Sequence, residues 1–199
     1  MWKQIRPAIL SLIILTVVTG LLYPLAMTGI ANAVFPRQAK GSLIEVDGKV
    51  VGSELIGQQF ASEKYFRGRL SATTAADPED ASKTVPAPYN ASNSAGSNLG
   101  PTNKALIDRV KDDVAAAQAE NGSTPVPIDM VTSSASGLDP HISPENALFQ
   151  IPRISKARGL SEGKLRELVE RATESRTLGI WGEPRVNVLL LNIALDRLQ

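Results

Sequence analysis

Residues 7–30 read Pro7-Ala-Ile-Leu-Ser-Leu-Ile-Ile-Leu-Thr-Val-Val-Thr-Gly-Leu-Leu-Tyr-Pro-Leu-Ala-Met-Thr-Gly-Ile30, and this stretch decides the fold. No acidic or basic residue occurs between Arg6 and Arg37, and the rest of the chain has no second stretch of this kind. A helix needs about 20 apolar residues to cross the hydrocarbon core of a bilayer. We therefore expect a membrane anchor at residues 1–36, with a single transmembrane helix at about 7–34.

A cleaved secretory signal peptide is the alternative interpretation of this segment. Lys3 and Arg6 precede the apolar run, and Ala31-Asn32-Ala33 matches the small-x-small pattern of cleavage sites. The apolar run is much longer than the roughly 7–15 residues of a signal-peptide core, which favours a retained anchor. Cleavage after Ala33 would instead release an exported soluble ligand-binding domain.

The anchor also carries residues that suit contact with another protein helix. Pro24 has no N–H, so a carbonyl near Gly20 is expected to lack its helical donor. Gly20, Thr16 and Thr19 are small enough for a neighbouring helix to approach closely. One side of the anchor is therefore predicted to face protein.

The flanking charges indicate the orientation of the anchor. Lys3 and Arg6 precede it with no acidic residue nearby, whereas the basic residues that follow it are mixed with acidic ones. Cytoplasmic flanks tend to be richer in Lys and Arg. The expected topology is a cytoplasmic amino terminus and an extracytoplasmic main domain.

The composition excludes several classes of function. The chain has 21 basic and 20 acidic residues, and removal of Lys3 and Arg6 leaves 19 basic against 20 acidic beyond the anchor (21 minus 2). A nearly neutral domain gives no electrostatic indication of nucleic-acid binding. The absence of cysteine excludes disulfides, thiol catalysis and thiolate metal sites.

Residues 37–199 are predicted to form one small soluble domain of mixed helices and strands, so the fold class is α+β with a single N-terminal transmembrane helix. Asp47-Gly48 predicts a hairpin turn between two short strands. Ser143-Pro144-Glu145 predicts a helix start, and Pro152 is expected to interrupt that helix. The other expected elements are a strand at 64–67, a long polar loop at about 71–103, a helix at 103–120, a strand at 126–132, a helix from Ser161, and a strand with a helical turn within 186–198.

The motifs of ATP hydrolysis are missing. The residues around Gly48-Lys49 fail the phosphate-binding-loop pattern, and the Asp-Lys-Thr-Gly-Thr sequence of P-type pumps does not occur. His141 is the only histidine, so no metal site is expected. Ser134 or Ser136 would have to form a nucleophilic triad with Asp139 and His141, and all of these residues lie within eight positions of the sequence. Working triads normally gather residues from distant segments, so a turn is the favoured interpretation.

Basic residues on the interrupted helix leave two interpretations open. Arg153, Lys156 and Arg158 would form a basic face that either contacts a partner or is solvated.

Eight segments, in order along nearly the whole chain, resemble KdpC, the family of small accessory subunits of bacterial Kdp potassium-transporting P-type ATPases. The most specific of them is Ser134-Ala-Ser-Gly-Leu-Asp139. The segments are Gly20-Leu-Leu-Tyr-Pro24, Gly41-Ser-Leu-Ile44, Val51-Gly-Ser-Glu-Leu-Ile-Gly-Gln58, Tyr65-Phe-Arg-Gly-Arg69, Ser94-Ala-Gly-Ser-Asn-Leu-Gly-Pro101, Val131-Thr-Ser-Ser-Ala-Ser-Gly-Leu-Asp-Pro-His-Ile-Ser-Pro144, Gln150-Ile-Pro-Arg-Ile-Ser-Lys-Ala-Arg158 and Pro184-Arg-Val-Asn-Val-Leu-Leu-Leu-Asn192.

The resemblance implies a non-catalytic accessory subunit of a high-affinity potassium importer in the bacterial plasma (inner) membrane. Its partners would be a channel-like potassium-binding subunit, the P-type ATPase catalytic subunit and a small membrane peptide. The anchor would contact these partners through the small and kinked part of its helix: Gly20, Tyr23, Pro24, Ala26 and Gly29.

The family is described as a catalytic chaperone that raises the ATP affinity of the pump subunit, so ATP is expected only through the complex and no cofactor is expected to be tightly bound. Gly96, Ser97 and Asn98 match the segment associated with nucleotide contact, although Ala95 replaces a glycine there. ATP is cytoplasmic, whereas the flanking charges place the domain outside. The alternative is a cap over the outer mouth of the potassium-binding subunit, with Asp77, Glu79 and Asp80 tuning ion entry.

Overall fold

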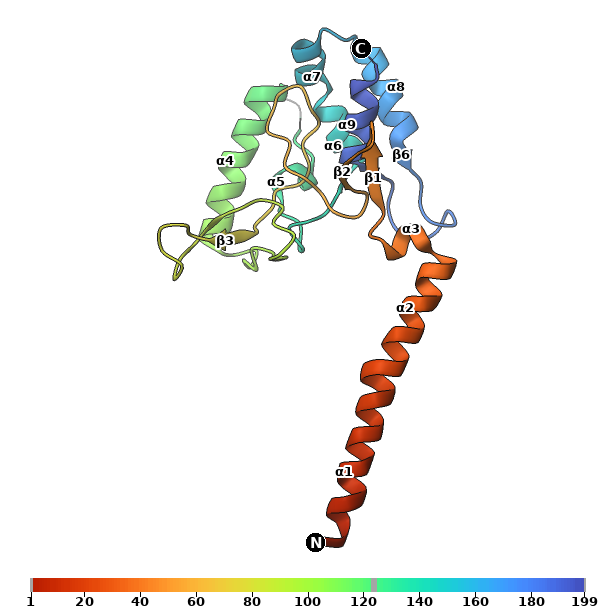
Figure 1. The fold of residues 1–199 in the computed structure, drawn as a ribbon. Coiled ribbons are helices and arrows are strands. Elements are labelled where there is room, and N and C mark those ends of the chain that lie inside the picture. The colour runs from red at the N-terminus through yellow and green to blue at the C-terminus, as the bar shows by residue number, and fades with distance from the viewer. Residues whose placement is uncertain (1, 123–124, 199) are drawn as a thin grey trace. The chain divides into compact units, whose positions relative to one another are not determined.

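The computed structural model describes residues 2–122 and 125–198 (Figure 1). The chain divides into two units, residues 1–51 and 52–199. The first unit contains the apolar helix and a hairpin except for the last two residues of its second strand, and the second unit contains the remaining helices and strands. Together they confirm the expected class, a single N-terminal apolar helix followed by a small mixed domain.

The apolar helix is continuous over Trp2–Val34, 33 residues, and is long and apolar enough to cross a membrane. It consists of α1 (Trp2–Val17), a π-helical turn η1 (Val18–Leu22) and α2 (Tyr23–Val34). None of its described residues is buried within the chain. The described side chains of this helix are therefore not covered by the chain itself.

The π-helical turn explains how the helix accommodates Pro24. Proline lacks an N–H and its ring clashes with the carbonyl one turn earlier, which normally kinks a helix. Here the Tyr23 N–H donates to the carbonyl of Val18, five residues back, so the wider turn lies directly before the proline. Thr19 Oγ1 also donates to the Leu15 carbonyl at 2.7 Å. The helix thus stays continuous through the predicted weak point.

A short helix and a hairpin follow the apolar helix. They are α3 (Pro36–Ala39), β1 (Leu43–Val46) and β2 (Lys49–Ser53), with β1 paired to β2. Asp47 and Gly48 connect the strands with φ of 51° and 74°. Positive φ at both central residues is what a two-residue hairpin turn requires, so the predicted Asp-Gly turn is confirmed.

The second unit contains the other elements. Its helices are α4 (Lys104–Asn121), α5 (Ile128–Val131), α6 (Pro144–Phe149), α7 (Ile151–Arg158), α8 (Glu162–Ala172) and α9 (Val188–Asp196). Its strands are β3 (Thr74–Ala76), β4 (Thr84–Pro86), β5 (His141–Ile142), β6 (Thr173–Glu174) and β7 (Arg185–Asn187). Strands β3 and β4 form an antiparallel hairpin, and β5, β7 and β6 form a three-stranded antiparallel sheet in that order.

The hydrophobic core lies where this three-stranded sheet meets α6, α7, α8 and α9. Figure 1 shows α8 beside α9 and α7 near them at the same end of the domain. Capping side chains start three of these helices: Ser143 for α6, Ser161 for α8 and Asn187 for α9. The core residues are Phe66, Ile142, Ala147, Ile151, Ile154, Leu165, Val169, Val186, Val188, Leu191 and Leu195.

The predicted strand at 64–67 is wrong. Side chains rather than a neighbouring strand satisfy its backbone: Asn192 accepts the Phe66 N–H at 2.9 Å and donates to the Phe66 carbonyl at 2.9 Å. Gln150 likewise accepts the Arg67 N–H at 2.8 Å and donates to the Arg67 carbonyl at 3.0 Å. Arg153 donates to the carbonyls of Glu63 and Tyr65. We call Gln150, Arg153 and Asn192 the Phe66 clamp.

Two further elements differ from the prediction. The strand expected at 126–132 is wrong, because Ile128–Val131 forms α5, which places Asp129 toward the start of α6. At the carboxyl end the strand stops at Asn187, whose side chain caps α9, so the helix is longer than the single turn expected.

The segment 71–103, expected as a long polar loop, contains the β3–β4 hairpin, and no other helix or strand is assigned within it. Ser71 Oγ donates to the Gly137 carbonyl at 2.8 Å and accepts the Tyr89 N–H at 2.9 Å. Thr73 Oγ1 donates to the Ala87 carbonyl at 2.6 Å and accepts the Asn90 N–H at 3.1 Å. Two hydroxyl groups thus fix the path of the segment.

Candidate functional site

The loop 133–139, which contains the most specific motif of the sequence, lies where three distant segments meet. The Ser134 N–H donates to the Leu70 carbonyl at 3.0 Å, and the Ser136 carbonyl accepts the Ala95 N–H at 3.0 Å. The Leu138 carbonyl accepts the Gly57 N–H at 2.8 Å. The motif therefore holds together three segments of the second unit that are far apart in the sequence.

Gly137 is required at the centre of this loop. Its φ is +68°, and an added Cβ would lie 2.4 Å from Thr73 Cγ2 and 2.7 Å from the Ala95 carbonyl oxygen. Both the backbone angle and the space exclude a side chain. The Ser-Gly-Leu pattern is thus explained by close approach of segments 71–73 and 94–97.

Tyr89 is the aromatic side chain that fills the centre of this region. A Cβ on Gly57 would lie 2.5 Å from its ring, and one on Gly68 would lie 2.3 Å from its hydroxyl oxygen. The Tyr89 hydroxyl donates to the Arg69 carbonyl at 2.7 Å. Burial raises the pKa of Tyr89 to about 12, and the negative charge of Asp139 adds to the effect. Tyr89 therefore stays a neutral donor.

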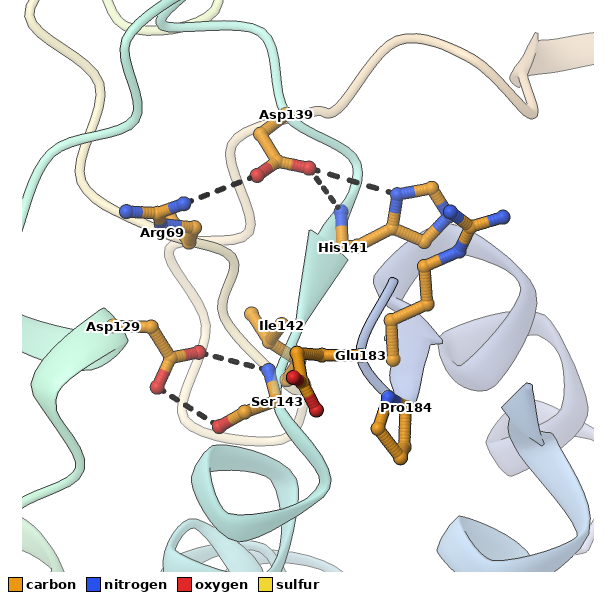
Figure 2. Close-up of a pocket in the computed structure, with 9 residues that line it drawn as sticks. Arg69, Asp129, Asp139, His141, Ile142, Ser143, Glu183 and Pro184 are labelled. Atoms are coloured by element: carbon orange, nitrogen blue, oxygen red, sulfur yellow. Dashed lines mark hydrogen bonds and ion pairs between the residues drawn. The ribbon is translucent and has the colours of Figure 1, made fainter. Parts of the chain in front are cut away.

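Asp139 joins this loop to Arg69 and His141 (Figure 2). Its carboxylate accepts the His141 N–H at 3.0 Å and an Arg69 Nη1–H at 3.3 Å, and lies 3.6 Å from His141 Nδ1. Burial alone would raise the pKa of Asp139, but the hydrogen bonds from His141 and the charge of Arg69 outweigh it and hold the pKa below its usual value. Asp139 is therefore an ionised structural partner.

Asp129 forms a second cluster at the start of α6. It accepts the Ser143 N–H at 2.8 Å, the Ser143 hydroxyl at 2.9 Å and the Asn146 side-chain amide at 3.0 Å. Ser143 Oγ in turn accepts the Asn146 N–H at 3.1 Å, which caps the helix. Asp129 thus reinforces the cap from another segment of the chain.

An open cavity of about 360 Å³ lies between these clusters. Figure 2 shows Asp139 between Arg69 and His141, with Asp129 facing Ser143 on the other side. Arg69 Nε is buried without a hydrogen-bond partner. The cavity is lined by Arg69, Asp129, Asp139, His141, Ile142, Ser143, Glu183, Pro184 and Arg185.

The chemistry of this cavity is that of a structural charge network. Internal donors occupy the carboxylates of Asp129 and Asp139. Within residues 2–122 and 125–198, no group of three His, Cys, Asp or Glu side chains could hold a metal ion. Ser136 Oγ accepts the Leu138 N–H at 3.1 Å, and Ser134 is buried. Ser136 therefore supports a turn, as the sequence indicated.

Comparison with known proteins identifies the family. The family model described as KdpC, K+-transporting ATPase, c chain, matches residues 5–197. The chain belongs to this family. A potassium-transporting ATPase KdpC subunit from Rhodopseudomonas palustris (strain BisB18) is 70% identical over 98% of each chain. The subunits from Methylorubrum extorquens and Bradyrhizobium diazoefficiens are 65% and 64% identical, covering 98% and 99% of this chain and 97% and 98% of theirs.

Family membership makes the chain an accessory, membrane-associated subunit of a potassium-transporting ATPase complex. Its apolar helix over Trp2–Val34 is the candidate membrane span.

Gly96, Ser97 and Asn98 follow a short contact with the loop 133–139. A Cβ on Gly96 would lie 2.8 Å from the Ala135 carbonyl oxygen, so this glycine permits close backbone packing. Ser97 and Asn98 are exposed, and Asn98 has a φ of 52°. Gly96 thus has a packing role of its own, whereas the next two residues face solvent.

The anchor residues expected to contact partners lie around the π-helical turn and beyond it. Gly20 is in η1, and Tyr23, Pro24, Ala26 and Gly29 are in α2. A Cβ on Gly20 or Gly29 would meet nothing within 4 Å, and all five residues are exposed. These positions leave the helix surface open for another protein to approach.

The basic residues on α7 do not form a free basic face. Arg153 is buried in the Phe66 clamp, where burial and the nearby charge of Arg67 lower its pKa to about 10. The Arg158 guanidinium lies 4.8 Å from the centre of the Tyr65 ring and donates to Asp196 at 2.6 Å. Two of the three basic residues are therefore structural.

The acidic residues proposed to tune ion entry also have local roles. Asp77 accepts the Glu79 N–H at 2.9 Å, and Asp80 accepts the Ser82 N–H at 3.0 Å and pairs with Lys83 at 3.1 Å. Hydrogen bonds from Ser82 and Lys83 lower the pKa of Asp80. Asp77 and Asp80 thus stabilise the turn between β3 and β4.

Sequence reasoning did not single out Arg69, Asp129, Gln150 or Asn192. Their partners are distant in the chain: Ser143 is 14 residues from Asp129, and Arg67 is 83 residues from Gln150. The only available signal was the occurrence of Arg69, Gln150 and Asn192 in segments that resemble the family.

Proposed function

We propose that this chain is a non-catalytic subunit that assembles a potassium importer and raises the ATP affinity of its pump subunit. In this proposal it lies in the bacterial plasma membrane, with the amino terminus in the cytoplasm and the domain 37–199 outside. Its partners are a channel-like potassium-binding subunit, a P-type ATPase catalytic subunit and a small membrane peptide.

The observation that carries the proposal is the exposed apolar helix. No described residue between Trp2 and Val34 is buried by the chain itself. Gly20 and Gly29 leave room for a second helix, and small residues are enriched where membrane helices pack closely. The helix is therefore suited to pack against other subunits rather than against lipid alone.

The assembly role is tested by enlarging the small residues of the helix. Gly20→Leu and Gly29→Leu should reduce co-purification of the other subunits, because a bulky side chain prevents close helix approach. Leu12→Ile is the matched control, since it changes shape but not volume at an exposed position. Unchanged co-purification of both glycine variants would contradict the role of these positions.

The orientation is tested with single cysteines, because the native chain contains none. Ser97→Cys and Glu167→Cys place thiols at two exposed positions of the domain. A membrane-impermeant thiol reagent should label both in intact cells if the domain is outside. Labelling only after lysis would place the domain in the cytoplasm.

The proposed rise in the ATP affinity of the pump subunit has two alternative mechanisms, and one variant distinguishes between them. In the first, assembly alters the pump subunit indirectly; the packing role of Gly96 and the charge bias of the anchor support this route. In the second, which requires the domain to lie in the cytoplasm instead, Ser97 and Asn98 contact the nucleotide, and their exposure supports it. Ser97→Glu should raise the KM for ATP only in the second route, because its charge repels phosphate. Ala91→Glu, also exposed, is the control.

A further inference from the structure

The connection between β6 and β7 carries three large apolar side chains on the surface. Leu178, Ile180 and Trp181 are 86%, 74% and 69% exposed. We call these three residues the apolar tip. Contiguous exposed apolar side chains commonly mark binding sites in folded proteins. The charge network and the Phe66 clamp do not use any of these residues.

The backbone holds the apolar tip in a defined shape. Thr177 and Trp181 exchange two hydrogen bonds, with N···O distances of 2.9 and 3.0 Å. Leu178 has a φ of 54°, which is unusual for a large aliphatic residue, and Gly179 and Gly182 have φ of 74° and 80°. The tip is thus ordered before it meets a partner, which lowers the entropic cost of binding.

The charges next to the tip are paired with one another. Arg176 Nη2 lies 2.5 Å from Glu183 Oε2, and Arg185 Nε lies 3.0 Å from Glu174 Oε2. These pairs leave no excess positive charge to attract lipid phosphates. A fluid bilayer accommodates many conformations of an apolar loop, whereas a protein pocket binds only a loop whose shape matches it.

We propose that the apolar tip docks into an apolar pocket of another subunit of the potassium-transporting ATPase, with Trp181 as its central anchor. This inference rests on the proposed assembly role. The pairing of the adjacent charges, the defined backbone and the place of the chain in a multisubunit complex all favour a protein partner. Tryptophan in a desolvated pocket is a frequent source of binding energy at interfaces.

The test uses Leu178→Cys and Ile180→Cys, labelled separately, so that each variant checks the other for damage caused by the substitution itself. Trp181 is intact in both. The labelling rate with a water-soluble maleimide is compared between the full chain alone in lipid nanodiscs and the assembled complex in the same nanodiscs. Glu167→Cys on α8 is the control, because this side chain is exposed and lies outside the tip.

We expect rapid labelling of both tip thiols in the chain alone and a decrease of about tenfold or more in the complex, because a docked tip is excluded from solvent. The control thiol should react equally in both states. Protection in both states would show that lipid covers the tip, and rapid labelling in both would show that nothing does; either result overturns the inference. Failure of the unsubstituted chain to co-purify with other subunits would instead contradict the assembly role.

Discussion

The Phe66 clamp and the apolar tip differ in what completes them. In the clamp, buried polar side chains meet the backbone of residues 63–67, and each amide has its partners within the same domain. In the tip, the backbone is bonded internally but the apolar side chains face outward. Substitutions in the clamp should therefore change folding, whereas those in the tip should change assembly.

The difference is one of chemistry as well as location. An unpaired polar group in the core loses its hydrogen bonds and cannot recover them from water, so its removal is costly. An exposed apolar side chain contributes little to its own fold because water surrounds it in both states. Removal of one side chain should therefore weaken folding in the clamp and assembly in the tip.

The largest expected effect is that of Gln150→Met in the clamp. Methionine keeps the approximate volume but removes the amide that bonds both backbone groups of Arg67 and also contacts Arg153. We expect a loss of about 3–5 kcal/mol in the free energy of unfolding, because several buried polar groups become unpaired. Urea unfolding of the full chain in detergent, followed by circular dichroism, measures it.

Glu170→Ala is the control for this measurement. Glu170 lies on the exposed face of α8, so the change should stay within about 0.5 kcal/mol. A Gln150→Met variant as stable as this control would show that the clamp contributes little to folding.

The next largest loss of folding stability is expected from substitution of Gly137, and Gly159, which has the same φ, is the comparison. Gly137 and Gly159 both have φ of +68°, but only Gly137 has neighbours within 4 Å of an added Cβ. Gly159→Ala should cost about 1–2 kcal/mol from the left-handed backbone alone. Gly137→Ala should cost about 1–3 kcal/mol more, because the new methyl group overlaps Thr73 and Ala95.

The same unfolding measurement isolates the packing contribution of the motif as the difference between the two variants. Equal costs would mean that segments 71–73 and 94–97 move aside easily, and that the motif glycine is needed only for its backbone angle.

A smaller, pH-dependent effect is expected at Asp139. Its pKa lies below the usual 3.8, so the folded chain binds a proton there less readily than the unfolded chain. Its contribution to stability is therefore complete above about pH 4 and is lost as the pH falls through the folded-state pKa. The advantage of the native chain over Asp139→Asn should shrink on acidification below about pH 4.

Thermal unfolding of both chains across this pH range measures that advantage. An advantage that grew on acidification would show that the carboxylate is destabilised by burial rather than stabilised by Arg69 and His141.

Local signals made part of the fold predictable. The Asp47-Gly48 turn and the helix starts at Asn103, Ser143 and Ser161 depend on residues within a few positions of one another. The apolar helix follows from composition alone. Each of these features is visible in a short window of sequence.

The rest depended on partners distant in the sequence. Residues 64–67 have the apolar and aromatic content of a strand, but the amides of Gln150 and Asn192, 83 and 126 residues away, replace a neighbouring strand. Asp129 likewise acts on Ser143 from a short helix that the sequence predicted as a strand. No local pattern specifies such pairs, so the candidate site could be predicted only as a motif and not as a geometry.

The smallest effect on folding is expected from Trp181→Ser in the apolar tip. Because the side chain is 69% exposed, its loss should change the free energy of unfolding by less than about 0.5 kcal/mol. The same variant should nevertheless dissociate from the other subunits faster, by about tenfold or more, if Trp181 anchors the interface. Retention of labelled partner subunits on the immobilised chain measures the dissociation rate.

Ile128→Ser, which removes an apolar side chain that is 78% exposed elsewhere in the domain, is the matched control and should leave retention unchanged. Equal retention for the two variants would make the tip an ordinary exposed loop, whereas a large loss of stability in Trp181→Ser would place the tip with the clamp, as a part of the fold.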